Sequence, residues 1–192
     1  GRSITVRRAQ SGEKITTLDE KEFTLNPANL VICDAEKPVA LAGIMGGANS
    51  GMDDKTPSLL FECATFARDS VRKTSRALGQ NSDSSARYEK GVDRNSPELG
   101  LARALHLIQE LDCGDITTLC YDLTDGRPLE RKQICTTPAK ICAVLGITVP
   151  DQTMIDILNR LEFTVDVQPD GSWVVSAPLY REDVEDFPDL AE

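Results

Sequence analysis

Short apolar segments separated by polar turns fill the first sixty residues, and this pattern most constrains the fold. Turn-forming residues such as Gly12, Asn26 and Pro27 separate them. Short strands joined by such turns pair with their neighbours, which predicts a mixed or antiparallel sheet. The predicted strands cover residues 3–6, 22–25, 30–33, 39–45 and 59–63.

Two helices are expected after these strands. The first covers residues 66–78 and ends at Gly79, a residue suited to the left-handed position after a helix. The second begins with Ser96 as its N-cap and Pro97 as its first residue, and it ends near Gly114.

The pattern changes after one more predicted strand at residues 116–121. The polar stretch 122–132 is the expected joint between two domains, 1–125 and 126–192. Two short helices followed by a hairpin resemble a winged-helix plan. The expected fold class is therefore α+β, a mixed or antiparallel sheet domain with packed helices followed by a small winged-helix-like α/β domain. Its predicted elements are helices at 138–145 and 152–161 and strands at 163–167 and 173–177 around Asp170 and Gly171.

Charge is unevenly distributed along a chain whose net charge is −10. Residues 126–192 hold six basic and twelve acidic side chains, which disfavours a DNA-binding winged-helix regulator. Basic residues gather instead between Arg68 and Arg94, where phosphates could bind. Residues 182–192 hold six acids and no base, which favours a cation or a basic partner.

The expected location is the cytoplasm, without membrane contact. No apolar run is long enough to span a bilayer, and the N-terminus lacks the apolar core of a signal peptide. The six cysteines lie in or beside apolar segments, so we expect buried, reduced thiols rather than disulfides. None forms a C-x-x-C pair, which excludes the common zinc patterns.

The stretch "PVALAGIMGGANSGM" (38–52) breaks from an apolar run into closely spaced glycines. Either the turn is tight or a ligand approaches the main chain there. The glycines do not fit the dinucleotide or nucleotide-loop patterns, and no G-x-S-x-G elbow exists. The single histidine, His106, lies on the apolar side of its predicted helix, which favours a core histidine over a catalytic base. The sequence therefore contains no self-contained hydrolase machinery of a known type.

Glu62 interrupts "SLLFECATF", a stretch that is otherwise largely apolar. A carboxylate in such a setting must be compensated or must await a ligand. Two interpretations stay open, an ion pair with a neighbouring arginine and a ligand-binding role. If the strand that carries Glu62 lies next to the strand that carries the Gly46–Gly47 pair, the Glu62 carboxylate and the exposed glycine backbone share one concave site.

Three motifs, "PVALAGIMGG", "LLFECATF" and "SSARYEKGVD", closely resemble in order and spacing the B3/B4 editing region of the beta subunit of bacterial phenylalanyl-tRNA synthetase. The tail from "AKICAVLGITVP" to "DVEDFPDLAE" resembles the B5 domain that follows in that subunit. The resemblance covers essentially the whole chain.

The resemblance implies an editing module that hydrolyses tyrosine wrongly attached to the tRNA for phenylalanine. Gly46 and Gly47 would form the pocket for the amino acid, and their amides would polarise the ester. Glu62 would accept the tyrosine hydroxyl. Ser82, where the family often has threonine, would line the pocket. Catalysis would then consist largely of water positioning.

For the whole enzyme, the resemblance implies ATP-dependent charging of this tRNA with phenylalanine by two alpha and two beta subunits. It also implies a magnesium ion shared with the alpha subunit and bound by Asp183, Asp189 and Glu192. The family has a histidine upstream of the first residue of this chain and a helix that continues beyond Glu192. We therefore expect an excised piece, truncated at both ends.

The alternative is a non-catalytic module for tRNA docking and subunit assembly. In that case Glu62 would only pair with an arginine. The residues that would contact RNA phosphates or the alpha subunit are Arg68, Arg72, Lys73 and Arg76.

Overall fold

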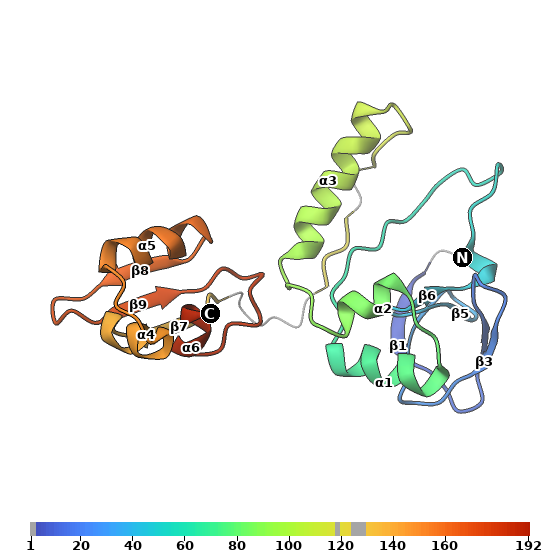
Figure 1. Cartoon of the computed structure of the whole chain (residues 1–192). Coiled ribbons are helices and arrows are strands. Elements are labelled where there is room, and N and C mark those ends of the chain that lie inside the picture. Colours follow the sequence, from blue (N-terminus) through green and yellow to red (C-terminus); the bar gives the residue numbers. More distant parts are fainter. Residues whose placement is uncertain (1–2, 118–119, 124–129) are drawn as a thin grey trace. The chain divides into compact units, whose positions relative to one another are not determined.

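The computed structural model describes residues 3–117, 120–123 and 130–192. The chain divides into two compact units, Gly1–Val92 and Asp93–Glu192 (Figure 1). Each unit has its own buried apolar cluster, and each is therefore described by itself. Across these described ranges, no helix is both long and apolar enough to cross a membrane.

The first unit is built on a four-stranded antiparallel sheet with the order β1-β4-β5-β6. Its strands are β1 (Thr5–Arg8), β4 (Leu30–Cys33), β5 (Pro38–Leu41) and β6 (Met45–Gly46). In the inner strand β4, Val31, Ile32 and Cys33 are buried. This apolar strand explains why the sheet forms there, and the expected antiparallel pairing is confirmed.

The predicted single strand at 39–45 is wrong, because the chain reverses within it. β5 and β6 pair as a hairpin in which Leu41 lies opposite Met45. Gly43 turns the chain with a φ of 68°, a conformation that side-chain-bearing residues adopt at a cost. The Ile44 amide donates to the Leu41 carbonyl at 3.0 Å and closes the turn. Glycine therefore decides between one strand and two at this position.

One further strand prediction is wrong, and one strand of the first unit was not predicted. Residues 59–63 form no strand, and Leu59, Leu60 and Phe61 are exposed. Strand propensity alone does not make a strand, because the backbone also needs a pairing partner. The missed strand β2 (Lys14–Thr16) has such a partner in β3 (Glu22–Thr24).

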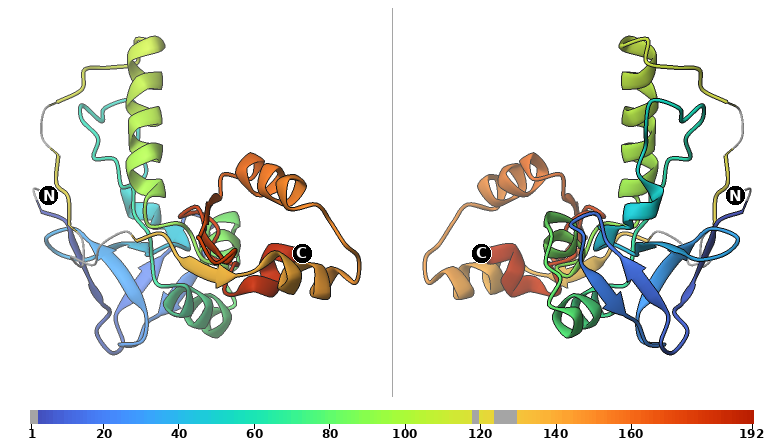
Figure 2. Two further views of the ribbon diagram at one scale, coloured as in Figure 1. Left: turned by 90° about the vertical axis from the view of Figure 1, so that its left-hand side faces the viewer. Right: turned by 90° about the vertical axis from the view of Figure 1, so that its right-hand side faces the viewer.

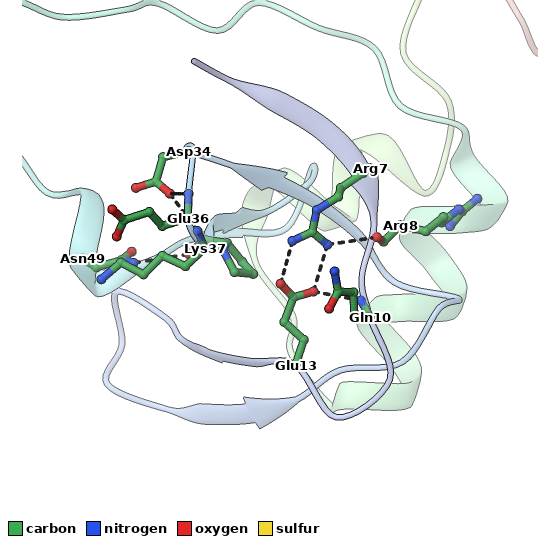
Figure 3. A network of polar contacts seen from close by, with 9 residues as sticks. Arg7, Arg8, Gln10, Glu13, Asp34, Glu36, Lys37 and Asn49 are labelled. Carbon is green, nitrogen blue, oxygen red and sulfur yellow. Dashed lines mark hydrogen bonds and ion pairs between the residues drawn. The ribbon is translucent and has the colours of Figure 1, made fainter. Parts of the chain in front are cut away.

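An arginine–glutamate pair fixes the end of β1 to the turn that follows it (Figure 3). The Arg7 guanidinium donates to both carboxylate oxygens of Glu13, at 2.6 and 2.9 Å. The same carboxylate accepts the Gln10 amide at 2.8 Å. These donors lower the pKa of Glu13, and the carboxylate raises the pKa of Arg7. Figure 3 also shows the turn between β4 and β5, where the Asp34 carboxylate accepts the backbone amides of Glu36 and Lys37.

Two helices pack beside this sheet (Figure 1). The predicted first helix is confirmed as α1 (Arg68–Leu78), and Gly79 follows it in the left-handed conformation. The helix α2 (Asp83–Tyr88) was not predicted. Ser82 caps it, accepting the Ser85 amide while the Ser85 hydroxyl accepts the Ser82 amide. A one-turn 3₁₀ helix, η1 (Ala48–Ser50), follows β6.

The second unit contains a three-stranded antiparallel sheet, β7-β9-β8, labelled in Figure 1. Its helices α4, α5 and α6 are the orange and red coils in Figure 2. Trp173 and Val175 of β9 are fully buried among apolar residues of the helices. The winged-helix-like plan is confirmed, with β7 as an unforeseen strand. The elements are α3 (Ser96–Glu110), β7 (Gln133–Thr136), α4 (Pro138–Leu145), α5 (Asp151–Arg160), β8 (Thr164–Val167), β9 (Trp173–Ser176) and α6 (Phe187–Ala191).

The segment between α3 and β7 holds two predictions. Of the strand predicted at 116–121, the described residues form no strand, and 118–119 lie outside the described residues. The predicted joint at 122–132 is described only in part, because 124–129 also lie outside.

The expectation of a core histidine is wrong. No residue of α3 is buried, and the exposed His106 lies 3.4 Å from Glu110 one turn later. The expectation of buried thiols holds for Cys33 alone. Cys142 is half-buried, and the exposed cysteines are Cys63, Cys113, Cys120 and Cys135.

Replacing Gly43 with alanine is expected to destabilise the first unit by about 3 kcal/mol, combining a left-handed alanine with overpacking. A Cβ there would lie 2.9 Å from the Phe66 ring and 3.1 Å from the Val71 side chain. Gly79→Ala is the matched control, because Gly79 has a φ of 63° and nothing within 4 Å of its Cβ position. Gly79→Ala should lower the free energy of unfolding by only about 1 kcal/mol. Urea unfolding measures both, and equal losses would contradict the packing argument.

Candidate functional site

The glycine-rich turn and the N-terminus of α2 are held together by serine hydroxyls. Ser82 donates its hydroxyl to the Ile44 carbonyl at 2.6 Å. Ser84 donates to the Gly43 carbonyl at 3.0 Å. These bonds fix the first residues of α2 over the β5–β6 turn, two residues before Gly46. The predicted pocket residues Ser82 and Gly46 therefore belong to one local arrangement.

Tyr88 holds the segment that carries Glu62 against the other end of α2. Its hydroxyl donates to the Ala64 carbonyl at 2.7 Å. Its ring meets the Phe66 ring edge-on, with centroids 5.2 Å apart. The Tyr88 ring also lies 3.3 Å from the Cβ position of Gly43. All three sequence motifs thus converge on α2, and the expected pairing of neighbouring strands is not what joins them.

Glu62 makes no ion pair or hydrogen bond with its side chain within the described part of the chain. Desolvation by surrounding groups raises the pKa of its carboxyl above the ordinary value. Because solvent still reaches the side chain, this desolvation is incomplete. The carboxylate also helps to raise the pKa of Tyr88, after burial, which is the larger cause. Among the described residues, then, the arginine pair that would make Glu62 purely structural is absent.

The packing of the protein itself requires glycine at two positions of the motif, Gly46 and Gly47. A Cβ on Gly46 would lie 2.9 Å from the Leu18 side chain, and one on Gly47 would lie 2.7 Å from the Val39 carbonyl oxygen. The Gly47 amide already donates to that carbonyl at 2.7 Å. It is therefore not free to polarise an ester. Bare backbone is needed here even without a ligand.

Two residues of this arrangement were missed by reasoning from sequence. Gly43 and Tyr88 lie inside the quoted motifs, yet neither was assigned a role. The available signal was the tyrosine in the otherwise polar "SSARYEKGVD", because an aromatic ring in such a segment needs a packing partner.

A hollow of about 410 Å³ lies elsewhere in the first unit. Lys14 and Lys37 are its basic lining residues. Neither Glu62 nor Ser82 nor the Gly46–Gly47 pair lines it. It is therefore distinct from the arrangement around α2.

The acidic residues predicted to bind magnesium have other partners. Arg181 donates to both oxygens of Asp183, at 2.8 Å to each, which lowers the pKa of that carboxyl. Asp189 accepts the backbone amides of Glu185 and Asp186 at the start of α6, which lowers its pKa as well. In the described ranges, no group of three or more His, Cys, Asp or Glu residues, Glu192 included, could hold a metal ion. These residues do not by themselves fit a magnesium site.

The fold and the site together define a class of protein. It is an α+β chain in which a sheet unit with a glycine-rich turn precedes a small winged-helix-like unit. The chain belongs to the B3/4 domain family, whose model matches residues 1–113. The model of the tRNA synthetase B5 domain matches residues 134–192.

Two relatives of the chain from different bacteria carry the same name. A phenylalanine–tRNA ligase beta subunit from Geobacter metallireducens is 41% identical over 192 residues, and one from Thermotoga maritima is 42% identical over 189 residues. These alignments cover 100% and 98% of this chain, and the chain spans 24% of the length of each relative. The resemblance stated from the sequence motifs is confirmed.

Among solved structures, an N-terminal fragment of the phenylalanyl-tRNA synthetase beta subunit from Pyrococcus horikoshii is similar to this chain. The match covers 98% of this chain and 54% of that chain, with 13% sequence identity and a TM-score of 0.43.

Replacing Glu62 with glutamine is expected to change stability in a pH-dependent way. The pKa of Glu62 is raised in the folded state, which means that ionisation of its carboxyl destabilises the fold. The free energy of unfolding of the wild type should therefore decrease as pH rises through and above the ordinary pKa of 4.5. The variant should match the wild type at pH 3.5 and be more stable than it at pH 7. Urea unfolding at both pH values measures the difference, and Glu36→Gln controls for the loss of one negative charge. A variant less stable than the wild type at pH 7 would indicate an ion pair instead.

Proposed function

We propose that this chain is the part of a phenylalanine–tRNA ligase beta subunit that removes tyrosine from mischarged tRNA. The observation that carries the proposal is the Glu62 carboxylate, which has no partner among the described side chains and lies beside α2. The relatives named as phenylalanine–tRNA ligase beta subunits support the setting in an aminoacyl-tRNA synthetase. The match to the B3/4 domain family supports the same setting.

Selectivity follows from the unpaired carboxylate. A tyrosine hydroxyl would donate a hydrogen bond to Glu62, whereas phenylalanine would leave the acceptor without a partner in a partly desolvated setting. Sites that bind a substrate hydroxyl in this way can reject the analogue that lacks it by about 10⁴–10⁵. The raised pKa of Glu62 agrees with such a setting, because partial desolvation disfavours the charged carboxylate.

The chemistry assigned to this site is ester hydrolysis by water. Water attacks the ester carbonyl, the bond to the ribose oxygen breaks, and the ribose oxygen takes a proton. Ser82 is not a nucleophile in this proposal, because its hydroxyl already donates to Ile44 and accepts from Ser85. Its role is to fix α2 over the turn. Gly46 would form the floor of the pocket, and Gly47 would shape it while its amide stays bonded to Val39.

For the whole enzyme we propose ATP-dependent charging of tRNA with phenylalanine, in a heterotetramer with the alpha subunit. Magnesium belongs to that proposal, with Asp183, Asp189 and Glu192 as its predicted ligands. Because these residues do not fit a metal site by themselves, no step is assigned to magnesium here. We also propose a cytoplasmic location and a division into domains 1–125 and 126–192. The two family models support this proposed division, because they leave residues 114–133 between them.

The test is deacylation of Tyr-tRNA and Phe-tRNA by the wild type and by Glu62→Gln. Loss of a hydrogen bond to a charged acceptor costs about 1.5–3 kcal/mol, so kcat/KM for Tyr-tRNA should fall roughly 10- to 100-fold. Hydrolysis of Phe-tRNA should not change. Glu36→Gln is the control, because Glu36 is an exposed carboxylate elsewhere in the same unit. Equal effects on the two substrates would contradict the role given to Glu62.

A further inference from the structure

The outward side of α1 carries a line of arginines. Arg68, Arg72 and Arg76 are four residues apart and therefore lie along one side of the helix. All three are exposed, and Lys73 is exposed next to them. The opposite side buries Val71 and its neighbours against the sheet. The helix thus presents a basic side to solvent, interrupted by one acid, Asp69.

The basic side chains of α1 and α2 differ from three other cations of the first unit in having no ion-pair partner among the described residues. Arg7, Lys14 and Lys21 each form an ion pair with an acid in the same unit. Six exposed side chains on and next to the two helices form no ion pair or hydrogen bond within the described part of the chain. They form what we call the α1–α2 basic surface: Arg68, Arg72, Lys73, Arg76, Arg87 and Lys90.

The charge of the whole chain does not oppose a polyanion at this surface. Residues 1–92 contain 13 basic and 12 acidic side chains, whereas residues 93–192 contain 8 and 19. The negative charge of the chain therefore resides in the second unit. At physiological salt the field of distant charges falls off over about 8 Å, so local cations dominate at this surface.

We propose that the α1–α2 basic surface binds the phosphodiester backbone of the RNA whose aminoacylated end enters the Glu62 site. The link is α2, which carries Ser82 at its N-cap and Tyr88 at the Glu62 segment, with Arg87 and Lys90 beside them. A helix of six residues is about 9 Å long, so phosphates at this surface lie close to the site. Placing the acylated end there rests on the proposed function, whereas the phosphate contacts do not depend on catalysis.

RNA fits this surface better than an acidic protein does. Guanidinium groups bind phosphates bidentately, and a line of exposed arginines can meet successive phosphates of one strand. Such contacts carry no sequence information. Binding should accordingly be strongly dependent on salt and weakly dependent on the identity of the tRNA.

The experiment compares two double variants of the whole chain, Arg72→Gln/Arg76→Gln and Arg103→Gln/Arg160→Gln. The second pair is the matched control, because it removes two exposed helical arginines from the second unit. The probe is unacylated tRNA for phenylalanine, labelled for fluorescence anisotropy and titrated between 0.05 and about 0.3 M salt, a range in which phosphate contacts dominate the salt response. Circular dichroism melting confirms that the variants fold.

Loss of two phosphate contacts should lower the slope of log K against log salt by about 1.4 for single-stranded RNA. If the electrostatic part vanishes at 1 M salt, the affinity at 0.1 M falls roughly 25-fold. The control pair should keep the wild-type slope, and Arg72→Lys/Arg76→Lys should retain most of the binding because the charges remain.

An unchanged slope in Arg72→Gln/Arg76→Gln would overturn the proposal and leave the surface to an acidic protein partner. Absence of binding by the wild type would overturn it as well. The Glu62→Gln variant separates the two proposals, since it should bind this RNA like the wild type while losing tyrosine-selective hydrolysis. Binding that depends on the α1–α2 basic surface, without hydrolysis of Tyr-tRNA, would support the role of the surface and count against the editing function.

Discussion

The contact of the Gly43 turn with Phe66, Val71 and Tyr88 is the interaction on which the candidate site depends. Gly43 takes a left-handed φ that reverses the chain, and its missing side chain leaves room for the two aromatic rings and the valine. Through this contact α1, α2 and the segment before α1 meet at one turn of the sheet. Serine bonds to Gly43 and Ile44 then fix the direction of α2. This packing and these hydrogen bonds bring the three motifs together.

This arrangement accounts for the unusual state of Glu62. Tyr88 holds residues 64–66 in place by its hydrogen bond and its ring contact, so the exposed Glu62 side chain is partly desolvated by its surroundings. No cation among the described residues compensates it, although arginines are abundant on α1. Those arginines point outward, away from the buried side of the helix that carries Val71. Within the described part of the chain, none of these bases pairs with Glu62, so the acid stays open to a neutral donor and the α1 arginines face solvent.

The glycine motif shows how packing and function can make the same demand on a sequence. Gly47 has no room for a side chain beside the Val39 carbonyl, and Gly46 has little beside Leu18. Close packing of backbone on backbone explains these glycines without a ligand. One wall of a pocket at this place would therefore be rigid backbone, in which the Gly47 amide is hydrogen-bonded to the Val39 carbonyl.

The sequence by itself determined the local choices. Gly79 ended α1, Thr137 and Pro138 began α4, and Asp170–Gly171 turned the hairpin β8–β9, because each depends on conformational preferences of a few neighbouring residues. The motifs also sufficed for the family and for Glu62 as a candidate. Only the tertiary structure decided whether residues 59–63 had a strand partner, whether His106 was buried and whether Glu62 had a counter-ion. These depend on contacts between residues distant in sequence, which periodicity and propensity do not encode.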